Sequence, residues 1–103
     1  MKKICIITGS RAEFSNLKPL ILKCQKSKVV NLTLLVTGSH LQKKYGNTVQ
    51  EIIDSNINID KLIHAHPIKN DTISILDSMS IGLKKFSNFF LKNKFNLVLV
   101  LGD

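Results

Sequence analysis

The sequence is poor in the residues that mark several common protein classes. Its 103 residues contain only two cysteines, and they do not have the C-x-x-C spacing of a structural zinc site. Neither a G-x-G-x-x-G dinucleotide fingerprint nor a P-loop lysine motif occurs. Its apolar stretches are too short for a membrane span or a signal peptide. We therefore predict a cytoplasmic protein without a metal, a cofactor or a membrane partner.

Arginine is scarcer still, because Arg11 is the only one and every other basic residue except histidine is a lysine. A formal net charge of +8 would suit a nucleic-acid partner. However, the lysines are scattered, and the few aromatic residues do not alternate with them. We interpret the charge as a solvated lysine surface and predict no nucleic-acid partner. Cys5 and Cys24 lie on apolar patterns, which indicates small buried side chains in a reducing compartment.

Apolar segments alternate with helical patterns along the chain. The predicted strands are residues 3–8, 30–37, 61–66 and 97–101, and the last is the most apolar, which predicts a central, buried position. Helical patterns open near Phe14 or Ser15, near Thr48 and near Asp71. This alternation predicts an α/β fold with a Rossmann-like, doubly wound parallel sheet of strand order 3-2-1-4.

Two helices carry further local signals. Ser15 is the expected N-cap of the first helix, which would put Pro19 within or just past its first turn. The third helix contains the small residues Ser80 and Gly82, which predict either close packing on the sheet or close approach of a ligand. An apolar stripe also runs along this helix: Ile73, Leu76, Met79, Leu83, Phe86 and Phe90.

Residues 8–13 have the composition of an anion-binding turn. They follow a buried strand and precede a helix, whose N-terminus offers unpaired N–H groups and the positive end of the dipole. Gly9 is expected to keep the turn tight, and the Arg11 guanidinium suits a phosphate. The alternative for Arg11 is an ordinary surface arginine on a βα loop.

Other polar residues follow the predicted strands. In the order 3-2-1-4, Asp103 faces residues 8–13 across the switch point, where it could hold a sugar hydroxyl or move a proton. It could instead be an N-cap or a loop aspartate. His40, after the second strand, could contact substrate, carry a proton or stabilise its loop. His64 and His66 bracket one residue, and we expect solvated or packed histidines there rather than a metal site.

Several of these segments together resemble the UDP-N-acetylglucosamine 2-epimerase family, in particular its hydrolysing branch. The first is T-G-S-R-A-E-F at 8–14, followed by L-x-P-L at 17–20. The second is V-T-G-S-H-L at 36–41 with Y-G-N-T at 45–48. S-x-G-L at 80–83 and V-L-V-L-G-D at 98–103 also fit, so the resemblance covers nearly the whole chain.

The resemblance implies two Rossmann-like domains around a cleft, as in GT-B folds. It implies conversion of UDP-N-acetylglucosamine and water to N-acetylmannosamine and UDP, by elimination of UDP and then hydration, in sialic or related nonulosonic acid synthesis. By the motif match, Arg11, Ser15 and Gly9 would contact UDP, and Asp103 and His40 would be the catalytic residues of this segment. Non-hydrolysing relatives carry a lysine where Asn16 stands, which favours the hydrolysing branch or a relative acting on a modified UDP-sugar.

We expect the sequence to be a partial N-terminal Rossmann-like domain, because the chain stops at the rim of its own predicted site. The rest of that domain and a second domain would lie elsewhere in a homo-oligomeric full-length protein, and residues 1–103 alone would be inactive. Two alternatives stay open at this stage. One is a UDP-sugar glycosyltransferase of GT-B type, and the other is a non-enzymatic, flavodoxin-like binding module.

Overall fold

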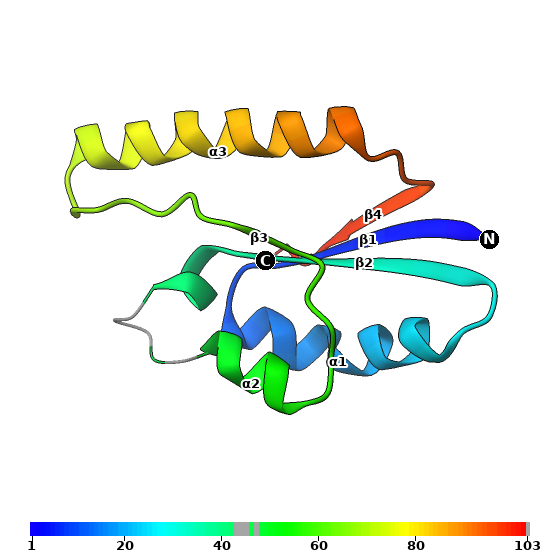
Figure 1. Ribbon diagram of the computed structural model, residues 1–103. Coiled ribbons are helices and arrows are strands. Elements are labelled where there is room, and N and C mark those ends of the chain that lie inside the picture. Colours follow the sequence, from blue (N-terminus) through cyan, green and yellow to red (C-terminus); the bar gives the residue numbers. More distant parts are fainter. Residues whose placement is uncertain (43–45, 47, 103) are drawn as a thin grey trace.

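A computed structural model describes residues 1–42, 46 and 48–102. The chain forms a parallel sheet of four strands with helices on both faces (Figure 1). The strands are β1 (Lys2–Thr8), β2 (Val30–Thr37), β3 (Lys61–Ile63) and β4 (Leu97–Val100), in the order β3-β2-β1-β4. β1 pairs along its whole length with β2, from Lys2 opposite Val30 to Thr8 opposite Val36. The predicted fold class and strand order are confirmed.

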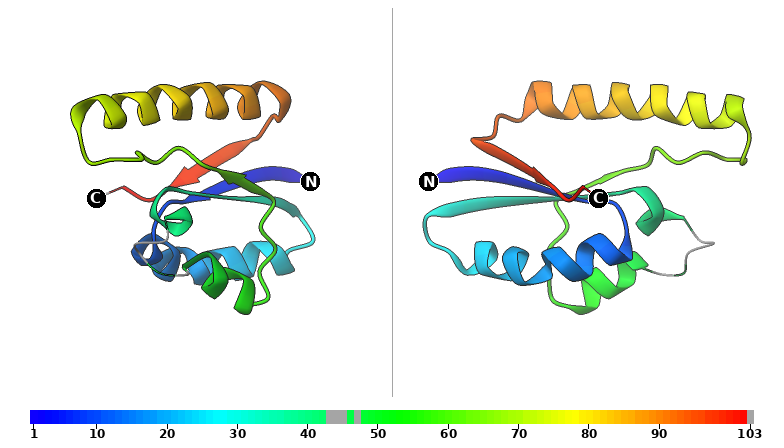
Figure 2. Two further views of the ribbon diagram at one scale, coloured as in Figure 1. Left: turned by 60° about the vertical axis from the view of Figure 1, so that its left-hand side comes forward. Right: turned by 180° about the vertical axis from the view of Figure 1, so that it is seen from behind.

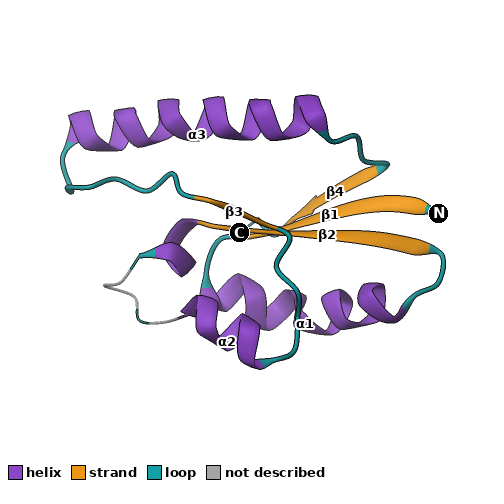
Figure 3. Cartoon of the chain, viewed as in Figure 1, coloured by secondary structure: helices purple, strands orange, loops and turns teal. Residues whose placement is uncertain are grey.

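Helices cover the two faces of the sheet unequally (Figures 1 and 2). α1 (Arg11–Lys26) and α2 (Thr48–Asp54) lie on one face, and the long α3 (Thr72–Lys92) lies on the other. A short 3-10 helix, η1 (Gly38–Leu41), follows β2 directly (Figure 3). β1 and β4 are neighbours, and the strand order reverses between them, which is where ligands of such sheets bind.

The face under α1 and α2 holds the larger core. Side chains alternate along a strand, so Ile6, Leu34 and Val36 all point to this face. They pack against apolar side chains of α1 and against Ile52 of α2. Each Å² of apolar surface removed from water stabilises the fold by about 25 cal/mol. The larger core is therefore the main source of stability.

The face under α3 holds a smaller core and corrects the prediction for this helix. Cys5, Leu35 and Ile63 are buried there, with four phenylalanines packed against them. The N-terminal part of the predicted apolar stripe is exposed instead: Ile73, Leu76, Met79 and Leu83. The helix turns its small residues inward, because Ser78 and Gly82 are its buried positions.

Gly82 allows the close approach of α3 to the chain that follows β3. A Cβ atom on Gly82 would lie 3.2 Å from Cβ of Ala65, which is a tight contact. Gly82 therefore has a packing role, but against the segment that follows β3 and not on the sheet as predicted. Ser80, which was paired with it in the prediction, is exposed.

The first helix begins earlier than predicted. Its N-cap is Ser10, not Ser15, and Pro19 consequently lies inside the helix rather than near its first turn. A proline there removes one intrahelical hydrogen bond. The sequence pattern missed this start because the apolar periodicity becomes regular only after the first turn, whereas the cap is a local hydrogen-bonding signal.

Two strands also differ from their predictions. β3 spans three residues instead of residues 61–66, because it pairs only with residues 35–37 of β2. β4 was predicted to be central and buried, but it lies at an end of the described sheet, and Leu97, Val98 and Val100 are exposed. The apolar run of a strand shows that both of its faces avoid water, but it does not give the position of that strand in the sheet.

The predicted burial of the two cysteines and the helices of the chain can be described further. Cys5 is buried as predicted, whereas Cys24 is only partly buried against the larger core. Among the helices of the described residues, none combines the length and the apolar character that a membrane crossing requires.

Candidate functional site

The turn between β1 and α1 is closed by a reciprocal capping box. The backbone N–H of Glu13 donates to Oγ of Ser10 (3.3 Å), and the Ser10 hydroxyl donates to Oε2 of Glu13 (3.2 Å). The second carboxylate oxygen of Glu13 accepts from the Gly9 N–H at 3.2 Å. Glu13 thus fixes the turn at three points, and its negative charge lies beside the positive end of α1.

The turn after β2 interlocks with this first turn. Gly9 O accepts from both the backbone N–H of Ser39 (2.8 Å) and the Ser39 hydroxyl (3.1 Å). Gly38 has a φ of +67°, and a Cβ atom on it would lie 2.4 Å from Gly9 O. Both the conformation and the space require glycine at position 38.

This geometry corrects the reason given for Gly9. A Cβ atom on Gly9 would make only an ordinary contact, 3.5 Å from Oε1 of Glu13. The glycine that lets the two loops approach is therefore Gly38. In this structure Gly9 acts through its backbone, with its N–H on Glu13 and its carbonyl on Ser39.

His40 lies behind the two loops and links three elements. Its side chain is 2% exposed, with Nε2 3.0 Å from Oγ1 of Thr8 and Nδ1 3.0 Å from Oγ1 of Thr48. The Thr8 hydroxyl donates to Ser10 O, which leaves Thr8 to accept from Nε2–H and Nδ1 to accept from Thr48. This is the arrangement of a loop-stabilising histidine. A catalytic role for His40 stays a prediction.

Burial decides the protonation state of the His40 ring. Desolvation lowers the pKa of His40, against a smaller opposing effect of the carboxylates of Glu13 and Glu51 and of the Ser10 carbonyl. The ring is therefore neutral at physiological pH and holds one proton for donation. A neutral ring with its proton on Nε2 satisfies both hydroxyl partners, because Nε2–H donates to Thr8 and Nδ1 accepts from Thr48.

Arg11 begins α1 and points away from the core. Its side chain is 70% exposed, and its Nε lies 3.2 Å from Oε2 of Glu51 on α2. Contact through Nε leaves the outer guanidinium nitrogens directed elsewhere. Among the described residues, the backbone N–H groups of Arg11 and Ala12 have no hydrogen-bond acceptor, as is usual at a helix start. Charge and donors for an anion therefore occur together here.

Most predicted site residues lie at the carboxyl edge of the sheet. Gly9 and Arg11 belong to the first turn, and Ser15 is exposed one helical turn after Arg11, on the same side of α1. His40 lies beneath them. Asp103, together with Tyr45 and Asn47 of the second-loop motif, lies outside the described residues. β4 pairs with β1, with Val100 opposite Ile7, so the chain approaches this edge from the neighbouring strand.

The two remaining histidines do not form a metal centre with other residues. The rings of His64 and His66 lie 6.2 Å apart, centre to centre. In the part of the chain that the structure describes, no group of three potential ligand residues comes together.

Two acidic residues of the site were missed at the sequence level. Glu13 had a signal, because S-x-x-E at 10–13 is the spacing of a capping box. Glu51 had none that linked it to Arg11. Forty residues separate the two, and only the packing of α2 beside α1 brings them together. The site therefore contains a positive residue held by a negative one, over a buried neutral histidine.

Comparison with known proteins gives the family of the chain. A model of the family described as UDP-N-acetylglucosamine 2-epimerase matches residues 22–103. The polysialic acid biosynthesis protein P7 of Escherichia coli is 40% identical over 103 residues, which are all of this chain and 26% of that protein. The GDP/UDP-N,N'-diacetylbacillosamine 2-epimerase (hydrolyzing) of Campylobacter jejuni is 36% identical over 99% of this chain and 26% of that protein.

A solved structure agrees in fold. UDP-GlcNAc 2-epimerase from Neisseria meningitidis, bound to UDP-GlcNAc, has a TM-score of 0.72 at 22% identity, over 98% of this chain and 26% of that one. The chain thus spans about a quarter of the length of these relatives. Since the family match covers most of its residues, including β2, β3 and β4, the chain belongs to the UDP-N-acetylglucosamine 2-epimerase family.

Proposed function

We propose that this chain supplies the diphosphate-binding edge of a hydrolysing UDP-sugar 2-epimerase. The reaction is UDP-N-acetylglucosamine plus water to N-acetylmannosamine plus UDP, in the synthesis of sialic or related nonulosonic acids. The observation that carries the proposal is the position of Arg11, exposed at the start of α1 where β1 ends. The relatives support the class, since their names include a hydrolysing 2-epimerase and a polysialic acid biosynthesis protein.

The loop would hold the leaving group of the reaction. In elimination of UDP, negative charge grows on the diphosphate as the bond to the sugar breaks. The Arg11 guanidinium, the free N–H groups of Arg11 and Ala12 and the α1 dipole would stabilise that charge. Ser15, one turn further along α1, would donate its hydroxyl to UDP from the same side. Gly9 contributes through the turn that it forms with Glu13 and Ser39.

Two further residues of the site would act by positioning. Glu51 holds Arg11 by Nε, which presents the outer edge of the guanidinium to a phosphate. His40 ties the end of β1 to α2 and so fixes the distance between Arg11 and Glu51. This role for His40 needs no contact with substrate, unlike the catalytic role that the motif suggested. Asp103 is proposed as the catalytic carboxylate of this segment on the motif match alone.

Asn16 supports the hydrolysing chemistry. It is exposed on α1, directly after Ser15, and by the resemblance it stands where non-hydrolysing relatives carry a lysine. The products distinguish the two reactions in a full-length protein that carries this chain as its N-terminal part. With UDP-N-acetylglucosamine as substrate, ³¹P NMR should show free UDP accumulating and no second UDP-sugar. Accumulation of UDP-N-acetylmannosamine without free UDP would contradict the hydrolysing assignment.

The role of Arg11 is tested by affinity for UDP, measured by calorimetry in that full-length protein. Arg11→Ala should weaken UDP binding by about 10- to 100-fold, since a charge-assisted contact is worth about 1.5–3 kcal/mol. Arg11→Lys should recover only part of the loss, because an ammonium lacks the planar fork. Lys23→Ala, a charge removal in the last turn of the same helix, should leave the affinity unchanged. If Arg11→Ala binds UDP as tightly as the wild type, the phosphate role is wrong.

A further inference from the structure

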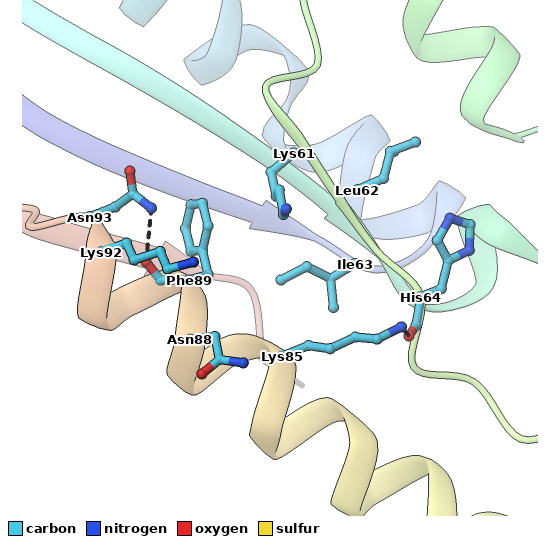
Figure 4. A pocket seen from close by; sticks show the side chains of 9 residues that line it. All are labelled: Lys61, Leu62, Ile63, His64, Lys85, Asn88, Phe89, Lys92 and Asn93. Atoms are coloured by element: carbon cyan, nitrogen blue, oxygen red, sulfur yellow. Dashed lines mark hydrogen bonds between the residues drawn. The ribbon is translucent and has the colours of Figure 1, made fainter.

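A hollow lies on the face of the sheet that α3 covers, between β3 and the C-terminal half of α3 (Figure 4). It encloses about 340 Å³. Leu62 and Ile63 of β3 and Phe89 of α3 are its apolar members. The amide side chains of Asn88 and Asn93 stand at its α3 side. Because α3 and α1 lie on opposite faces, this hollow is separate from the turn that carries Arg11.

The charges around this hollow are all of one sign. Three lysines line it, Lys61, Lys85 and Lys92, and no acidic residue does. The Lys85 ammonium donates to the carbonyl oxygen of His64, which ties α3 to the chain beyond β3. Within residues 1–42, 46 and 48–102, no carboxylate forms a salt bridge with any of the three. Lys61 and Lys92 therefore bring positive charge that the described chain does not neutralise.

Each lysine alone has an ordinary explanation. Lys61 on a strand at the end of a sheet discourages pairing with another chain. Lys92 in the last turn of α3 interacts favourably with the negative end of the helix dipole. These explanations require only that the ammonium groups be near the strand or the helix end. They do not account for the direction of the two side chains, which both turn toward the same hollow beside Phe89 (Figure 4).

We propose that this hollow binds a small organic anion of monosaccharide size, bearing a phosphate or a carboxylate. Its volume lies at the lower end of the range of ligand pockets, about 300–1,000 Å³. Ammonium groups bind phosphate and carboxylate alike, as point charges. Phe89 and Ile63 accept the less polar part of the ligand, and the Asn88 and Asn93 amides accept or donate hydrogen bonds to hydroxyl groups. The proposal does not depend on the UDP site.

An NMR titration of the ¹⁵N-labelled chain tests the proposal with four probes: glucose 6-phosphate, glucuronate, glucose and inorganic phosphate. The two sugar anions should shift the amide signals of Ile63, His64, Asn88 and Asn93 in a saturable manner, and raised salt should weaken both. Glucose should cause no such shift. A response to glucose 6-phosphate but not to glucuronate, or the reverse, identifies which acid group the lysines accept.

Paired variants separate a site from general charge attraction. The double variant Lys61→Ala/Lys92→Ala should raise the dissociation constant of the sugar anions by about tenfold, as the loss of two exposed charge contacts. Lys23→Ala/Lys84→Ala removes the same charge from exposed positions outside the hollow and should change it less than twofold. The proposal is overturned if both variants weaken binding equally, if inorganic phosphate binds as well as the sugar anions, or if no probe shifts these signals.

Discussion

The two faces of the sheet differ in how completely their apolar side chains are buried. Under α1 and α2, residues from both helices and from β1 and β2 form one closed cluster. Over the other face, a group of phenylalanines near the C-terminal end of α3 packs on the sheet, and the small residues of α3 contact the segment that follows β3. Large apolar side chains of α3 stay exposed. The first face is a finished core that fixes the candidate site. On the second face, the described chain buries only some of the apolar side chains of α3.

The largest expected effect tests where the stability resides. Leu34→Ala removes a side chain that is fully buried between β2 and α1, and should lower the free energy of unfolding by about 3 kcal/mol. Leu83→Ala is the matched change on α3, where the side chain is 72% exposed, and should cost no more than about 0.5 kcal/mol. Urea denaturation followed by circular dichroism measures both. Equal losses would show that the two faces are packed alike.

The next effect concerns the interlocked loops at the edge of the well-packed face. Gly38→Ala forces a side chain into a left-handed conformation and against the Gly9 carbonyl, so we expect a loss of about 2 kcal/mol or more. Gly9→Ala has room for its methyl group and should cost about 1 kcal/mol or less. Thermal unfolding of the two variants ranks them. If Gly9→Ala lowered the melting temperature more than Gly38→Ala, Gly9 and not Gly38 would be the glycine that keeps the turn tight.

A smaller effect depends on pH through His40. Its pKa in the folded chain lies below the usual 6.5, so the unfolded chain binds the extra proton first as pH falls. The stabilisation is therefore fully present above pH 6.5, decreases as the pH falls from there, and is lost once the pH passes the lowered folded pKa. Urea denaturation between pH 8 and pH 5 should show this decrease. His40→Gln should have a flatter profile over the same window, and identical profiles would exclude His40 as its source.

The smallest expected effect is on the rate of Cys5 modification, which depends on how often α3 moves away from the sheet. Burial, with a further contribution from Asp60, raises the pKa of the Cys5 thiol to about 11, and Cys5 lies under α3. A thiol reagent at pH 8 should therefore modify the partly buried Cys24 first, and Cys5 only when α3 lifts. Mass spectrometry of the time course separates the two. Phe89→Ala should speed Cys5 labelling, whereas unchanged labelling would show that α3 does not open independently.

The sequence predicted the features that depend on local periodicity and on simple topological rules. The alternation of apolar strands and amphipathic helices sufficed for the parallel sheet and for its strand order. That order also predicted the position of Arg11 at the carboxyl edge of the sheet. The motifs at 8–14, 36–41 and 45–48 together indicated the family whose model matches residues 22–103.

What the sequence missed depends on contacts between distant segments. The apolar stripe on α3 predicted which side of the helix is buried, but Gly82 and Ser78 are the buried residues and face the segment that follows β3. The partnership of Arg11 with Glu51 needs the packing of two helices, and the burial of His40 needs two loops to close over it. The start of α1 was a different kind of error, because the Ser10–Glu13 spacing was visible and outweighed by an apolar pattern.

The position of β1 in the middle of the sheet affects how the chain must be assembled during synthesis. Its pairing with β2 closes a connection of modest length, so those two strands can associate soon after they leave the ribosome. Its other edge pairs only with a late segment: the backbone and side chain of Asn96 both form hydrogen bonds with the backbone of Lys3, 93 residues earlier. Until β4 is synthesised, one edge of β1 stays unpaired and can pair with another extended segment. Folding of this sheet therefore includes a slow last step, during which the chain is prone to misassociation.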